Sequence, residues 1–150
     1  MAHSYGSCLF HFTFSTKNHQ HLIAPEWRPR LWEYMGGIAK AITMKSLCIG
    51  GTSNHAHVLL LVPPRMAPAK AVQLIKGGSS RWVHESIPGQ KDFAWQEGYG
   101  VFSIGFSQVD ATRRYIANQE EHHRTKTFEE EYRAFLKKHE IAFDEEFFLG

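Results

Sequence analysis

The chain has 150 residues, 43% of them hydrophobic and 13% aromatic, which is enough for one domain with a packed core and too few for two ordinary domains. This composition argues against a disordered protein, and its longest apolar run falls far short of the roughly 20 residues that a membrane helix needs. The sequence starts without a secretory signal pattern, so we expect a cytoplasmic protein with no membrane partner.

The formal net charge of +2 is unevenly distributed along the chain. Residues 1–126 contain 14 Lys and Arg against 8 Asp and Glu, whereas residues 127–150 contain 3 against 7. A basic body favours an anionic partner, although an excess this small does not by itself identify nucleic acid. We expect one domain over residues 1–150, with an acidic helical tail over residues 127–150.

Hydrophobic periodicity predicts four strands and several helices along the chain. Strands are expected at residues 8–15, 46–50, 55–62 and 99–106. Helices are expected at residues 27–43, 68–75, 79–85, 107–123 and 128–139. The order βαββαβ followed by helices predicts a ferredoxin-like α+β fold, in which a mainly antiparallel four-stranded sheet carries helices on one face and C-terminal helices are added.

Local signals define three of the helix boundaries. Gly77 and Gly78 are expected to interrupt the second helical segment, because glycine is costly inside a helix. Ser107 is the expected cap of the helix that contains Tyr115. Thr127 and Glu130 have the spacing of a capping box, which predicts the start of the last helix.

Two histidines begin the strand at residues 55–62. His55 and His57 are two residues apart, so both imidazoles project from one face of the strand and can reach one metal ion. With ten histidines in the chain this spacing also arises by chance, and His19 and His21 repeat it in a polar stretch. The apolar strand that follows His57 favours the first pair as metal ligands, with partly buried histidines as the alternative.

The predicted helix at residues 107–123 contains a candidate nucleophile. Tyr115 and Gln119 are four residues apart and share a helix face, which His122 nearly shares. A tyrosine can attack phosphorus and become covalently joined to DNA, but its high pKa requires a nearby metal or base. On periodicity alone, a core-facing aromatic is favoured over a nucleophile for Tyr115. Arg113 and Arg114 could hold phosphates or lie free on the surface.

Five segments of the chain, taken together and in this order, resemble the single-tyrosine HUH transposases of the insertion-sequence-200/605 family. The segments are residues 14–18, 50–60, 70–77, 95–100 and 115–123. In this resemblance His55 and His57 match two metal ligands, Gln119 matches the third, and Tyr115 matches the nucleophile. The basic residues expected to contact DNA are Lys17, Lys76, Arg81, Arg113 and Arg114.

The resemblance implies a ferredoxin-like fold, dependence on Mg²⁺ or Mn²⁺, and a 5′-phosphotyrosine intermediate on single-stranded DNA. It also implies recognition of hairpins near the ends of a mobile element. A further implication is a homodimer in which the tyrosine helix of one subunit can complete the histidine site of the other.

Several other functions remain open at this point. A domesticated relative acting on repeated genomic palindromes would share the chemistry and differ in substrate. A replication initiator or relaxase would share the paired histidines, although such proteins are usually larger. A non-catalytic RNA-binding module with a ferredoxin-like sheet could stack bases on Phe10, Phe12 and Phe14. A small zinc-stabilised protein is disfavoured, because the sequence has no four-ligand Cys/His spacing.

Overall fold

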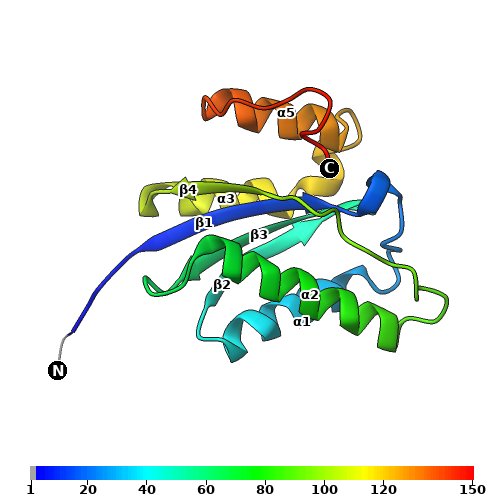
Figure 1. Ribbon diagram of the computed structural model, residues 1–150, viewed down its shortest axis with the longest axis horizontal. Coiled ribbons are helices and arrows are strands. Elements are labelled where there is room, and N and C mark those ends of the chain that lie inside the picture. The colour runs from blue at the N-terminus through cyan, green and yellow to red at the C-terminus, as the bar shows by residue number, and fades with distance from the viewer. Residues whose placement is uncertain (1–2) are drawn as a thin grey trace.

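A computed structural model describes residues 3–150, which form a four-stranded sheet between two layers of helices (Figure 1). The strands are β1 (Cys8–Ser15), β2 (Lys45–Gly51), β3 (His55–Val62) and β4 (Gly100–Ile104). The longer helices are α1 (Arg28–Ala41), α2 (Pro68–Ser86), α3 (Val109–Ala117) and α5 (Phe128–Lys138). The short ones are η1 (Lys17–His19), η2 (Phe106–Gln108) and α4 (Gln119–His122).

The sheet has the strand order β2-β3-β1-β4, and each pair of neighbours is antiparallel. This order confirms the predicted ferredoxin-like α+β fold. Helices α1 and α2 cover one face, as expected, whereas α3 and α5 lie over the opposite face (Figure 1). No helix among residues 3–150 has the length and apolar character needed to cross a membrane.

Alternation along β3 divides its side chains between the two faces of the sheet. Ala56 and Val58 belong to the main hydrophobic core beneath α1 and α2, together with Phe12 of β1. The intervening side chains point to the other face, where Leu59 packs against Ile116 of α3. The two histidines of β3 therefore face the layer that contains α3 and α5.

The predicted interruption of the second helix was wrong, because α2 is continuous from Pro68 to Ser86. At Gly78, an added Cβ would lie 2.7 Å from Cδ1 of Ile38 in α1. The absence of a side chain at this position lets the two helices pack closely. The cost of glycine inside the helix is therefore offset by packing that periodicity alone does not show.

The single helix predicted for residues 107–123 is divided in two. Helix α3 ends at Ala117, Asn118 leaves helical geometry with φ −97° and ψ 19°, and α4 then covers Gln119–His122. The predicted Ser107 cap was also wrong: a 3-10 turn precedes α3, and α3 has no side-chain cap among the described residues.

The last helix begins where the sequence predicts. Glu130 N–H donates to Oγ1 of Thr127 at 3.1 Å, which confirms the capping box. Its inner face packs Phe128, Tyr132 and Leu136 against Phe102 of β4 in a small hydrophobic cluster. Residues 139–150 do not continue this helix and form turns and irregular backbone.

Candidate active site

The histidine pair of β3 lies fully buried on the face covered by α3 and α5. His55 Nδ1 lies 2.9 Å from Asn54 Oδ1 and 3.0 Å from Thr52 Oγ1, while its Nε2 lies 2.9 Å from Gln119 Oε1. Burial, followed by the charge of His57, lowers the pKa of His55 to about 3, so the imidazole is neutral near pH 7. When the ring hydrogen of His55 is on Nδ1, the lone pair of its Nε2 faces the Gln119 oxygen. Both atoms can then bind one cation placed between them.

His57 is oriented by a second buried histidine. His11 Nε2 lies 2.8 Å from His57 Nδ1, and the other ring nitrogen of His57 lies 2.8 Å from Glu131 Oε1. Burial, followed by the charge of His57, lowers the pKa of His11 to about 3. A neutral His11 that donates from Nε2 would fix the ring orientation of His57, as partners of ligating histidines commonly do.

Tyr115 of α3 reaches the same cluster from the side. Its hydroxyl contacts a carboxylate oxygen of Glu131 and lies 3.3 Å from His122 Nε2. Burial, together with the negative charge of Glu131, raises the pKa of Tyr115. The phenol is therefore protonated near neutral pH and needs help to act as a nucleophile.

Glu131 of α5 is the centre of the cluster, and its place there was not predicted from the sequence. Its side chain is 2% exposed, and its carboxylate also lies 3.1 Å from His123 Nε2. Burial alone would raise the pKa of Glu131, but the surrounding imidazoles, His57 foremost, lower it well below its usual range. His123 Nε2 is close enough to the carboxylate for an ion pair, but it is not oriented to form a hydrogen bond with it.

One feature of the sequence could have indicated that Glu131 is buried: it lies between Phe128 and Tyr132 on the apolar face of α5.

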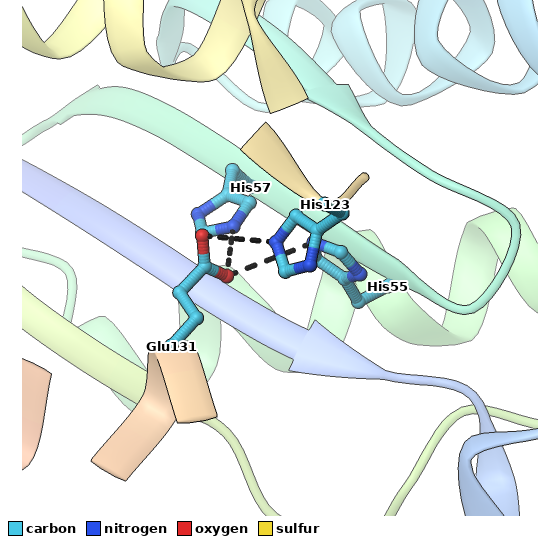
Figure 2. A group of neighbouring side chains, drawn as sticks. All are labelled: His55, His57, His123 and Glu131. Atoms are coloured by element: carbon cyan, nitrogen blue, oxygen red, sulfur yellow. Dashed lines mark hydrogen bonds and ion pairs between the residues drawn. The ribbon is translucent and has the colours of Figure 1, made fainter. Parts of the chain in front are cut away.

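The buried group could hold a divalent metal ion. Nitrogen and carboxylate atoms of His55, His57, His123 and Glu131 all lie within 4.8 Å of one another (Figure 2). If the ring hydrogen of His55 is on Nδ1, no hydrogen lies between its Nε2 and Gln119 Oε1, and a cation bound by both atoms would stabilise this close approach. Imidazole and oxygen ligands together suit transition ions such as Mn²⁺, and Mg²⁺ accepts the oxygen part of such a set.

The five basic residues predicted to contact DNA have different surroundings. Lys17, Arg113 and Arg114 are exposed, and exposed Arg81 pairs with Glu85 at 3.3 Å. Lys76 instead donates to the carbonyl oxygens of residues 96, 97 and 98 at 2.6, 3.1 and 2.9 Å. Burial lowers the pKa of Lys76 to about 8. Because its ammonium group is committed to these carbonyls, Lys76 is the weakest of the five as a DNA contact.

The structure thus brings Tyr115, His55, His57 and Gln119 together within one chain. A cavity of about 450 Å³ opens beside Tyr115 between β4, α3 and α5. Lys126 and Lys138 are among its lining residues. An anionic strand could approach the tyrosine through this cavity.

Comparisons with known proteins point to one protein family. Residues 4–119 match the family model described as "Transposase IS200 like". The transposases for insertion sequence element IS200 of Salmonella typhimurium and Salmonella typhi are each 25% identical over 111 residues, covering 70% of this chain and 72% of theirs.

Two solved structures share the fold. A candidate transposase from Deinococcus radiodurans R1 aligns with a TM-score of 0.62 and 20% identity, over 79% of this chain and 96% of that one. A REP-associated tyrosine transposase bound to a REP hairpin aligns with a TM-score of 0.60 and 15% identity, over 82% of this chain and 73% of that one. The family match covers most of the chain, and the protein belongs to the IS200-like transposase family.

Proposed function

We propose that this transposase cleaves and rejoins single-stranded DNA at hairpin-bearing element ends, with Tyr115 as the nucleophile. The observation that carries the proposal is the meeting of the Tyr115 hydroxyl and the His57 imidazole on one buried carboxylate. The phenol oxygen would attack the scissile phosphorus and the bond to the 3′ oxygen would break, leaving a 5′-phosphotyrosine and a free 3′ hydroxyl. The phenol proton leaves as the 3′ oxygen gains one, and the retained ester energy allows rejoining without ATP.

We propose that His55, His57 and Gln119 hold Mg²⁺ or Mn²⁺. The support is the neutral, buried state of His55 and the approach of Gln119 Oε1 to its free nitrogen. The ion would polarise the phosphate and offset the charge that develops on it. The chain itself fixes the ligands: Thr52 and Asn54 orient His55, and His11 orients His57.

The partner and assembly proposals rest on the family. Single-stranded DNA with hairpins is the proposed substrate in the cytoplasm, in line with the hairpin held by the REP-associated relative. Lys17, Arg81, Arg113 and Arg114, and less strongly Lys76, are the proposed DNA contacts. We also propose a homodimer with shared active sites, which would require α3 and α4 to exchange between subunits. Residues 1–150 would then form one HUH domain with residues 127–150 as its acidic tail.

The RNA-binding alternative loses its main support in the structure. Phe12 and Phe14 are buried beneath α1 and α2, and Phe10 packs against the same core. These rings cannot present a stacking surface on the sheet. A domesticated relative that acts on genomic palindromes keeps the same site and differs only in the DNA that it recognises.

The test is cleavage of labelled single strands that cover the DNA on both sides of the gene. The wild-type protein should give a covalent adduct on a denaturing gel, and Tyr115→Phe should bind the strand without forming it. Tyr34→Phe is the matched control, because Tyr34 is exposed on α1, on the other side of the sheet. Normal adduct formation by Tyr115→Phe, or equal cleavage of the same sequence as a duplex, would contradict the proposal.

A further inference from the structure

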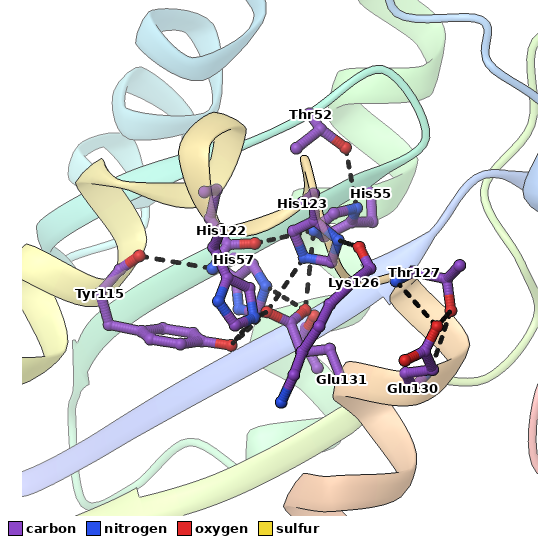
Figure 3. Close-up of polar contacts among 12 residues, drawn as sticks. Thr52, His55, His57, Tyr115, His122, His123, Lys126, Thr127, Glu130 and Glu131 are labelled. Carbon is purple, nitrogen blue, oxygen red and sulfur yellow. Dashed lines mark hydrogen bonds and ion pairs between the residues drawn. The ribbon is translucent and has the colours of Figure 1, made fainter.

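Glu131 connects the two halves of the site through its two carboxylate oxygens. Oε1 lies 2.8 Å from His57 Nε2 and 3.7 Å from His55 Nε2, on the side of the proposed metal ligands. Oε2 contacts the Tyr115 hydroxyl and lies 3.3 Å from His122 and 3.1 Å from His123 (Figure 3). The carboxylate therefore spans the space between the histidine pair and the nucleophile.

A reacting phosphate would have to bind in this space, between the Tyr115 hydroxyl and the histidine pair. A nucleophile must lie in contact with its electrophile, and one phosphate oxygen must reach the metal ligands. The group now in contact with the Tyr115 hydroxyl is the Glu131 carboxylate, an anion with two oxygens like those of a phosphodiester. Two anions in one buried space would repel each other strongly, so carboxylate and phosphate cannot occupy it together.

We propose that Glu131 occupies the binding site of the scissile phosphate, that His122 and His123 contact the phosphate there, and that α5 withdraws Glu131 when DNA enters. We call this position the phosphate site. The inference rests on the proposed function, because it assumes that Tyr115 attacks DNA. It assigns a ligand class, a phosphodiester, to His122 and His123, which lie beyond the family match at residues 4–119 and outside the proposed ligand set of His55, His57 and Gln119; His123 is therefore given to the phosphate rather than to the metal ion.

The position of α5 in the chain supports a closing role for this helix. The family match ends at residue 119, so α5 is an addition to the matched segment. Its hydrophobic contacts form a small cluster with Phe102, separate from the main core beneath α1 and α2. A helix held by so small a cluster can move at lower cost than one in the core. The cavity lined by Lys126 and Lys138 lies directly beside it.

The test measures binding of a labelled oligo(dT) single strand in EDTA, with all variants made in the Tyr115→Phe protein so that no cleavage occurs. Glu131→Gln keeps the side-chain shape and removes the charge. If the closed arrangement holds about 90% of the molecules, this change should tighten binding roughly tenfold. Glu129→Gln is the matched control, because Glu129 is an exposed neighbour on the same helix and loses the same charge; its affinity should change less than about twofold.

Two further sets of variants separate the parts of the proposal. Glu131→Asp keeps the charge but shortens the side chain, so the carboxylate can no longer reach the Tyr115 side of the site. It should therefore show part of the increase in oligo(dT) affinity that is expected for Glu131→Gln. Adding His122→Ala or His123→Ala to Glu131→Gln should remove the gain, whereas adding His21→Ala, at an exposed histidine, should not. Circular dichroism confirms that each variant is folded.

Each outcome decides the proposal. Equal affinity of Glu131→Gln and Glu129→Gln would overturn it, as would a gain that survives loss of both histidines. If Glu131→Gln instead weakens Mn²⁺ binding in calorimetry and leaves binding of oligo(dT) in EDTA unchanged, Glu131 is a metal ligand and the inference fails. Cleavage by Tyr115→Phe would contradict the proposed function alone, because the binding assay in EDTA contains no cleavage step.

Discussion

Gly50 of β2 controls how closely the tyrosine helix approaches the sheet. A Cβ added at this position would lie 2.8 Å from the backbone oxygen of Ile116 and 3.0 Å from its Cγ2, against 3.4 Å or more for an ordinary contact. Ile116 follows Tyr115 directly in α3. Because the interior is close-packed, Gly50→Ala should push this part of α3 outward by roughly 0.5 Å.

The size of this shift sets the expected effects. Overpacking of this kind costs about 1–3 kcal/mol in the free energy of unfolding. A misplacement of about 1 Å can slow a reaction on the order of 100-fold, so we expect cleavage by Gly50→Ala to be roughly tenfold slower. Urea unfolding measures the first effect, and the rate of adduct formation on the labelled single strand measures the second.

Gly77→Ala provides the control for this experiment. Gly77 lies inside α2, and an added Cβ there would meet no atom of the described residues within 4 Å. Replacing a helical glycine by alanine should stabilise the protein by about 0.5–1 kcal/mol and leave cleavage unchanged. If Gly50→Ala cleaves at the wild-type rate, the close approach of α3 to β2 does not position Tyr115, and the reasoning is refuted.

Three further predictions address the metal, the buried histidines and the assembly. EDTA should abolish cleavage, Mn²⁺ or Mg²⁺ should restore it, and His55→Ala should lose Mn²⁺ binding in calorimetry; full activity in EDTA would exclude the metal. Because the pKa values of His11 and His55 fall from 6.5 to about 3 on folding, the unfolded chain binds protons first as the pH drops. The free energy of unfolding should therefore decrease below pH 6.5 by up to about 1.4 kcal/mol per pH unit for each histidine, and His11→Gln should flatten this profile in urea titrations. If subunits share active sites, mixing the Tyr115→Phe and His57→Ala proteins should restore part of the cleavage. If subunit exchange is shown and cleavage is still absent, the site lies within a single chain, as in the structure.

Much of the fold follows from local patterns in the sequence. The strands β1 and β3 have the predicted bounds, because alternation and the prolines after Val62 define where their apolar pattern ends. The capping box at Thr127 likewise gives the start of α5. The glycines of α2 misled the prediction, since their role is contact with another helix, and such a contact has no local signal.

The site was predictable only where its residues lie on matched segments. His55, His57, Tyr115 and Gln119 were predicted as site residues in this way, and the structure brings them close to one another. His11 and Glu131 were missed because their proximity depends on sheet register and on how α5 folds back over the sheet. A charged residue on the apolar face of a predicted helix, as Glu131 is, was the one local indication.

The alternation of β3 also determines which insertions and deletions the chain can tolerate. His55 and His57 face the site, while Ala56 and Val58 anchor the same strand in the main core. Adding or removing one residue between the histidines would turn one imidazole into the core and one apolar side chain into the site. Length variation in natural relatives should therefore be found outside β3, in surface segments such as residues 88–92, where no strand register has to be kept.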